Sequence, residues 1–140
     1  MQKLLIDSGP LVALFDSDDH WHRPIADFLE QYSGELVTSA ANVTEAAWIT
    51  ASASDRMLAN LLTWLHRGAV SVHNLEPQDF SRIADLAARY RTLRPDFADL
   101  ALLALAERLK LDRILTLDKK DFMVYRLKNG RALRNMLVTE

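Results

Sequence analysis

Short apolar runs alternate with helical patterns along this chain, and the alternation restricts the possible folds more than any other feature. Four runs have the length and composition of buried strands; they are residues 4–6, 35–39, 69–74 and 113–117. Segments with apolar residues at helical spacing separate them, as in DRMLANLLTWLHRG at 55–68. Because strands that alternate with helices are joined by crossovers, the sequence predicts a three-layer α/β/α sandwich with a mainly parallel sheet of four or five strands.

The end of the chain leaves the fifth strand open. VYRL at 124–127 and NMLV at 135–138 each have the composition of an edge strand. A length of 140 residues is enough for one hydrophobic core and too short for two ordinary ones. We therefore expect a single domain over residues 1–140.

Acidic residues stand at the positions where this fold places ligands. Asp7 directly follows the first strand, and Asp118 follows the fourth. Ligands of open parallel sheets bind beyond the carboxyl ends of the strands, and the N-termini of the helices lie at that same edge. Asp99, which begins the helix before the fourth strand, and Glu45, which begins the helix after the second, belong there by the same reasoning. The sequence predicts that these carboxylates converge.

The stretch PDFADL at 95–100 has a second interpretation that needs no ligand. After Pro95, Asp96 fits the N-cap of a helix and Asp99 fits its third position, where a carboxylate is favourable. Capping alone does not require convergence with Asp7 and Asp118, and close carboxylates repel one another unless a cation or protons compensate them. We therefore expect Asp96 to cap the helix, and Asp99 both to fit the third position and to face an ion.

The residue types favour a hard divalent cation. The chain contains no cysteine, and no histidine lies near the acids in sequence. Oxygen ligands alone select Mg²⁺ or Mn²⁺ over zinc, and Mg²⁺ commonly handles phosphate groups. The pattern indicates metal-assisted hydrolysis of a phosphodiester.

Four stretches, in order, resemble the PIN-domain nucleases, and most closely the VapC-type toxins of bacterial toxin–antitoxin pairs. They are LIDSGPLVAL, NVTEAAW, DFADLALLALAERL and ILTLDKKDF, and the resemblance runs from residue 4 to about residue 126. It implies a compact α/β/α sandwich, an Mg²⁺- or Mn²⁺-dependent ribonuclease acting on RNA, a homodimer, and an antitoxin partner whose C-terminal segment approaches the acidic site.

The resemblance also implies roles for individual residues. Asp7 and Asp99 are similar to the family's principal metal ligands. Glu45 resembles the glutamate that holds or orients the ion and the attacking water, and Asp118 resembles the fourth acid. Supporting positions are Ser8 and Thr116, which resemble hydroxyls that hydrogen-bond to the cluster, and the neighbouring acids Asp96 and Asp121. Ser8 stands where the family often has Thr or Ala.

Composition indicates the cellular compartment and the kinds of partner that we expect. The absence of cysteine excludes disulfides and favours a reducing cytoplasm. No apolar run has transmembrane length, and no cleavage pattern follows the N-terminal residues, so we expect neither a signal peptide nor a membrane segment. Residues 119–134 hold six basic side chains against one acid, in a chain of net charge −2. This segment is compatible with RNA binding and equally with a solvated end of the chain.

Other interpretations stay open at this point. A housekeeping PIN nuclease without an antitoxin, and a PIN-like module that binds RNA or protein without catalysis, both fit the same motifs.

Trp21 fits simple packing or stacking on an RNA base. The apolar stripe of residues 55–68 fits the core or a groove for a partner helix. A haloacid-dehalogenase-like phosphatase is disfavoured, because it needs a second Asp where this chain has Gly9.

Overall fold

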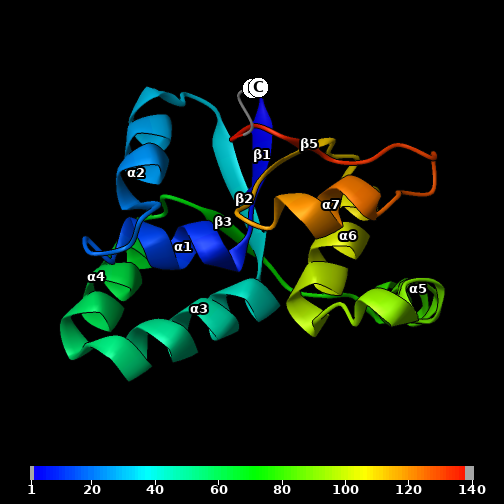
Figure 1. Cartoon of the computed structure of the whole chain (residues 1–140), viewed down its shortest axis with the longest axis horizontal. Helices are drawn as coiled ribbons and strands as arrows, with labels where there is room; N and C mark the ends of the chain where they lie inside the picture. The colour runs from blue at the N-terminus through cyan, green and yellow to red at the C-terminus, as the bar shows by residue number, and fades with distance from the viewer. Residues whose placement is uncertain (1, 138–140) are drawn as a thin grey trace.

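The computed structural model describes residues 2–137, and its centre is a five-stranded parallel sheet (Figure 1). The strands are β1 (Lys3–Ile6), β2 (Glu35–Ser39), β3 (Ser71–His73), β4 (Arg113–Leu115) and β5 (Arg134–Asn135). Their order is β3-β2-β1-β4-β5, and every neighbouring pair is parallel. The order changes direction between β1 and β4, because β2 and β3 extend the sheet from one side of β1, and β4 and β5 extend it from the other.

Helices cover both faces of the sheet, as Figure 1 shows. The first group is α1 (Ser8–Leu14), α2 (His22–Gln31), α3 (Ala40–Ala53) and α4 (Asp55–His66). The opposite face carries α5 (Pro77–Arg89), α6 (Phe97–Leu109) and α7 (Lys119–Val124), with a short 3₁₀ turn at Arg91–Leu93. The predicted α/β/α sandwich is confirmed. None of the helices within residues 2–137 is both long and apolar enough to cross a bilayer.

The strands divide their side chains between two cores, as the period of two requires. Leu5, Val37 and Ile114 belong to the core beneath α5, α6 and α7, whereas Leu4, Leu36 and Leu115 belong to the core beneath α1 to α4. Helix α6 is buried over every residue from Ala98 to Ala106. Its nearly all-apolar sequence is therefore explained by contact with the sheet on one side and with α5 and α7 on others.

The stripe on α4 is mainly a packing surface. Leu61 is fully buried, and Trp64 packs edge-on against Phe15 of the core beneath α1 to α4, with ring centroids 5.7 Å apart. Leu62 is 49% exposed. The core interpretation therefore accounts for most of the stripe.

The prediction of an edge strand at 124–127 is wrong. Val124 ends α7, and the guanidinium of Arg126 donates hydrogen bonds to the carbonyls of Met123, Val124 and Tyr125. Phe122 and Tyr125 lie three residues apart, and both face the core. This helical spacing, together with the N-cap at Asp118, outweighs the strand propensity of Val and Tyr.

The second candidate for the fifth strand, residues 135–138, coincides with the observed strand only at Asn135. Strand β5 comprises only Arg134–Asn135, so it begins one residue before the predicted segment; Val138 lies outside the described residues. Other predicted boundaries are also displaced. The third strand is Ser71–His73 within the predicted 69–74, and the fourth ends at Leu115, before the predicted residue 117.

Gly34 is fixed by the close approach of β1 and β2. A Cβ atom at this position would lie 2.5 Å from the carbonyl oxygen of Gln2, which accepts the N–H of Glu35 as the strands begin to pair. We expect Gly34→Ala to lower the free energy of unfolding by about 1–3 kcal/mol through this overlap. Urea unfolding measures the change. The exposed neighbour Ser33→Ala is the control, and equal stabilities for the two variants would contradict the assignment.

Candidate active site

Asp96 and Asp99 divide the two roles that the start of α6 offers. Asp96 is the N-cap, and its carboxylate accepts the backbone N–H of Asp99 at 2.9 Å. Asp99 occupies the third helical position and is only 8% exposed. Within residues 2–137, the one hydrogen-bond partner of its carboxylate is the hydroxyl of Tyr125, which donates to Oδ2 over a long 3.4 Å. Capping therefore accounts for Asp96, while the buried carboxylate of Asp99 does no capping.

Asp7 is held tightly from three sides. It follows β1 and caps α1, where its Oδ1 accepts the N–H of Ser8 at 2.8 Å. The same oxygen accepts the amide of Asn42 at 3.2 Å, and Oδ2 accepts the hydroxyl of Thr116 at 2.7 Å. These donors come from β1's own turn, from α3 and from the residue after β4. The carboxylate is 6% exposed and has a fixed orientation.

Thr116 connects two of the acids. Its hydroxyl donates to Asp7 and accepts the backbone N–H of Asp118 at 3.0 Å. Ser8 takes a less direct position, because its hydroxyl accepts the amide of Asn42 at 2.9 Å and does not bond to a carboxylate. Both hydroxyls expected to support the cluster thus lie in its hydrogen-bond network.

Asn42 belongs to this network and was not predicted from the sequence as a site residue. It is fully buried, its amide donates to Asp7 and Ser8, and its carbonyl oxygen accepts the hydroxyl of Ser39, the N-cap of α3. An Asn at the start of a helix pattern is typical of a cap, which hides any role in a site. The useful signal is its place in the first turn of the helix that follows β2, at the carboxyl edge of the sheet.

The acids from four parts of the chain line one cavity of about 400 Å³ at the carboxyl edge of the sheet. Its lining is Asp7, Ser8, Gly9, Glu45, Ile49, Asp96, Asp99, Leu117 and Asp118. The structure therefore brings together every acid of the expected principal set, with Asp96 beside them. Within residues 2–137, no lysine or arginine lines this cavity.

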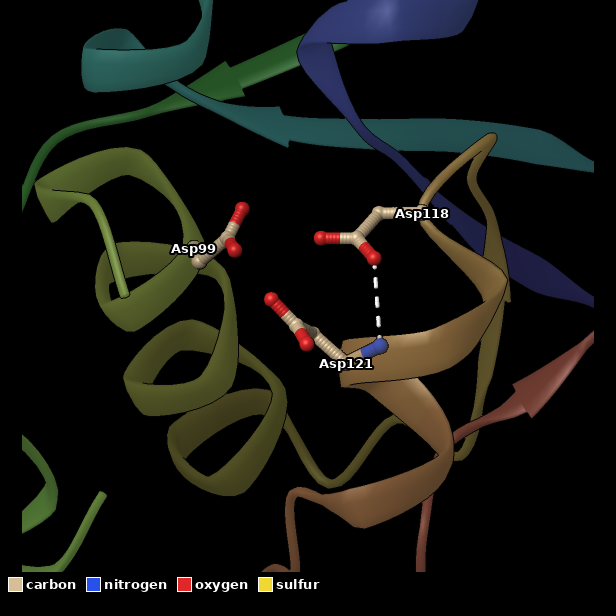
Figure 2. Close-up of side chains that lie close together, drawn as sticks. All are labelled: Asp99, Asp118 and Asp121. Atoms are coloured by element: carbon tan, nitrogen blue, oxygen red, sulfur yellow. Dashed lines mark hydrogen bonds between the residues drawn. The ribbon is translucent and has the colours of Figure 1, made fainter. Parts of the chain in front are cut away.

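Asp121 approaches the same cluster without lining the cavity. One carboxylate oxygen from each of Asp99, Asp118 and Asp121 lies within 4.8 Å of the others. In Figure 2 the three side chains point toward one another, from α6, from the turn before α7 and from α7 itself. The backbone N–H of Asp121 donates to Oδ1 of Asp118 at 3.1 Å, which makes Asp118 the N-cap of α7 (Figure 2).

Burial and mutual repulsion disfavour the charged forms of these acids. Burial raises the pKa of Asp7 from 3.8 to about 6, and the nearby charges of Asp96 and Glu45 add to the effect. The pKa of Asp99 is also raised, first by burial and then by the charges of Asp7, Asp96 and Asp118. Burial likewise raises the pKa of Asp118. Clustered carboxylates with raised pKa values mark a candidate functional site, since such strain on ionisation is unusual in a purely structural cluster.

The donor set fits a divalent cation. Carboxylate oxygens alone face the cavity, apart from the hydroxyl of Ser8, and no nitrogen or sulfur ligand side chain lines it within the described part of the chain. Such a set suits a hard ion such as Mg²⁺ or Mn²⁺. Asp7, Asp99 and Asp118 could hold the ion, with Glu45, Asp96 or Asp121 beside them, and a cation would offset the repulsion that raises the pKa values.

Comparison with known proteins places the chain in a family. The sequence profile of the PIN domain matches residues 4–127. Ribonuclease VapC26 of Mycobacterium tuberculosis (strain ATCC 25618 / H37Rv) is 30% identical over 129 residues, which span 91% of this chain and 95% of that protein.

Two solved structures share the fold. The crystal structure of M. tuberculosis VapC20, described as a Sarcin-Ricin loop cleaving toxin, has a TM-score of 0.77 at 14% identity and covers 84% of this chain and 91% of its own. A toxin-antitoxin complex from Klebsiella pneumoniae has a TM-score of 0.65 at 20% identity, covering 85% and 89%. At these identities the likeness concerns the fold.

Neutralising Asp99 should stabilise the metal-free protein at alkaline pH. Because its pKa is raised on folding, the stability associated with Asp99 is fully present below the ordinary value of 3.8 and is lost as the pH rises through the raised pKa. We expect Asp99→Asn, in chelator, to raise the free energy of unfolding by about 1–3 kcal/mol at pH 8 and by much less at pH 5.

Thermal unfolding between pH 5 and pH 8 measures this difference. Asp112→Asn is the matched control, because the side chain of Asp112 is 84% exposed. A destabilised Asp99→Asn at pH 8 would show that its carboxylate is not under repulsive strain.

Removing Asn42 should have the opposite effect on stability. Asn42→Ala removes one buried donor from Asp7 and one from Ser8, and we expect a loss of about 2–4 kcal/mol in the free energy of unfolding. Asn60→Ala on the exposed face of α4 serves as control and should change it by less than about 0.5 kcal/mol. Urea unfolding distinguishes the two, and equal effects would refute the bridging role.

Proposed function

The chain belongs to the PIN-domain family, and from this premise we propose that it is a divalent-metal-dependent endoribonuclease that hydrolyses RNA phosphodiester bonds. In the cell it would act as the toxin of a toxin–antitoxin pair. The observation that carries the proposal is the single cavity lined by Asp7, Glu45, Asp99 and Asp118, together with Asp96, at the carboxyl edge of the sheet. RNA is its substrate, and Mg²⁺ or Mn²⁺ its cofactor.

The acids take different parts in this proposal. Asp7 is oriented by three donors and presents its oxygens in fixed directions, whereas Asp99 accepts one long hydrogen bond and keeps most of its lone pairs for the ion. When bound, the cation would stabilise the negative charge that develops on the phosphoryl oxygens in the transition state and would lower the pKa of water. Asp118, held through Thr116, completes the ligand side of the cavity.

Glu45 has the position for handling water. It is half-buried and lines the cavity from α3, whereas the other lining acids come from α6 and from the residues that precede α1, α6 and α7. A carboxylate there orients an attacking water by accepting its hydrogen bonds and can take its proton as the water attacks phosphorus in line. The bond from phosphorus to the leaving oxygen breaks as the new bond forms, so no covalent enzyme intermediate is required.

The comparisons support the substrate and the partner. The 30% identical relative is named a ribonuclease, and the related folds include a toxin that cleaves the sarcin-ricin loop and a toxin-antitoxin complex. By extension, this chain acts on RNA and is inhibited by a small antitoxin protein. The same proposal includes a cytoplasmic location, since RNA and antitoxin are available there. It also includes a homodimer. A housekeeping nuclease would instead cleave RNA without any neutralising partner.

Activity should depend on both the acids and the ion. We expect Asp7→Asn and Asp99→Asn each to reduce cleavage of total RNA by roughly a hundredfold or more, and chelator to abolish it in the parent protein, with recovery on adding Mg²⁺ or Mn²⁺. Asp85→Asn on the exposed surface of α5 is the charge-matched control and should retain activity. Circular dichroism verifies the fold of each variant. Undiminished cleavage by a folded Asp99→Asn protein would refute the site.

A further inference from the structure

The acidic cavity raises the question of what holds a polyanionic substrate beside it. Five carboxylates line it, and within residues 2–137 no cationic side chain does. Phosphate contacts by Lys and Arg normally supply most of the affinity for nucleic acids. Even with a bound ion, the flanking phosphates of an RNA would need cations just outside the cavity.

Lys119 is adjacent in sequence to the lining of the cavity. It directly follows Asp118, whose carboxylate lines the cavity, and it is the first residue of α7. Its Nζ atom lies 4.9 Å from the centroid of the Trp21 ring. The side chain is half-buried, whereas the next residue, Lys120, is exposed. Lys119 thus has a defined position, since contact with an aromatic face holds a flexible ammonium group.

Trp21 is itself fixed by the loop between α1 and α2. Its backbone N–H donates to Oδ1 of Asp19 at 2.7 Å, and its ring packs edge-on against His20, with centroids 5.2 Å apart. The neighbouring His22 ring contacts the carbonyl of Ala13 through Nδ1 at 2.8 Å. The Trp21 ring also packs against the core beneath α1 to α4. It therefore offers Lys119 a stable platform.

The ammonium group of Lys119 keeps its hydrogen-bonding capacity for a ligand. No carboxylate in the described residues lies within ion-pair distance of it, although Asp118 and Asp121 are close in sequence. An aromatic face attracts the charge without providing a lone-pair acceptor, so the N–H donors remain available. By contrast, Arg126 in the same basic segment uses its guanidinium on the carbonyls that end α7.

We propose that Lys119 binds a phosphate of the RNA backbone next to the acidic cavity, and that Trp21 is a positioning residue that holds its ammonium group there. The contact is to phosphate, so it carries no base specificity. This role for Trp21 does not involve stacking on an RNA base, because the ammonium group of Lys119 lies over its ring. This inference rests on the proposed function in taking RNA as the substrate.

Binding and cleavage are measured separately to test it. Fluorescence anisotropy follows a labelled single-stranded RNA of about twelve nucleotides in chelator at several salt concentrations, where no cleavage occurs. Steady-state cleavage of the same RNA with Mg²⁺ gives KM and kcat. The variants are Lys119→Met, Lys119→Arg and Trp21→Leu. The matched control is Lys128→Met, which removes an exposed lysine near the other end of α6, where Lys128 and Lys110 line a different cavity.

We expect Lys119→Met to raise the RNA dissociation constant and KM by about tenfold, with kcat within about twofold of the parent value. The slope of log affinity against log salt concentration should fall in magnitude by about one, the value for one lost phosphate contact. Lys119→Arg should restore the charge and most of the affinity. Trp21→Leu should raise KM less than Lys119→Met without lowering kcat, and Lys128→Met should change neither constant.

Two results would overturn the inference. One is a dissociation constant and salt slope for Lys119→Met equal to those of the parent protein. The other is an unchanged KM with a lowered kcat, which would assign Lys119 to the chemical step. If the parent protein binds RNA but cleaves none with any ion, the proposed function fails, and the binding series still decides the role of Lys119.

Discussion

The burial of Asp7 beside Asp99 is the interaction on which the rest of the site depends. Two carboxylates at the carboxyl edge of the sheet, 6% and 8% exposed, are costly to ionise without compensation. Asp7 receives three donors, from Ser8, Asn42 and Thr116, and its pKa rises only to about 6. Asp99 receives one long hydrogen bond, and burial together with its acidic neighbours raises its pKa further. A cation would compensate this repulsion, which is why stability without metal and activity with metal should respond oppositely to loss of Asp99.

Much of the fold was predictable because its constraints are local. The strand at 35–39 has the predicted bounds, because Gly34 precedes it and Ser39, the N-cap of α3, ends it. Asp96 and Asp99 stand at the N-cap and third position as expected, since capping depends only on neighbouring backbone groups. Helix α7 was missed because its six residues are too few to show a helical period, and because Val124 and Tyr125 favour strands. Core packing of Phe122 and Tyr125 instead favours a helix that ends at Val124, with Tyr125 as its C-cap.

The position of the acids was predictable for a topological reason, whereas their partners were not. Residues that follow parallel strands, and residues that begin the intervening helices, must reach one edge of the sheet. That rule brings Glu45 to Asp7 without knowledge of any side-chain direction. It cannot identify Asn42 or Tyr125, because a hydrogen bond depends on rotamers and on separations of a few tenths of an ångström. Either residue could equally have been a cap or a core aromatic in a sequence with the same pattern.

Capping and ligand binding prove to be compatible uses of the same residues. Asp7, Asp96 and Asp118 are the N-caps of α1, α6 and α7, and each uses one oxygen to accept a backbone N–H of its helix. This bond fixes the carboxylate, and the other oxygen keeps lone pairs that a cap does not need. Because these helices begin at the same edge of the sheet, their caps are brought together around one cavity. Asp99 differs from them in having no capping bond. Its place in the first turn of α6 favours a negative charge, but that place does not require the carboxylate to be buried among other acids. Burial in this acidic cavity is what the cation that we propose would compensate.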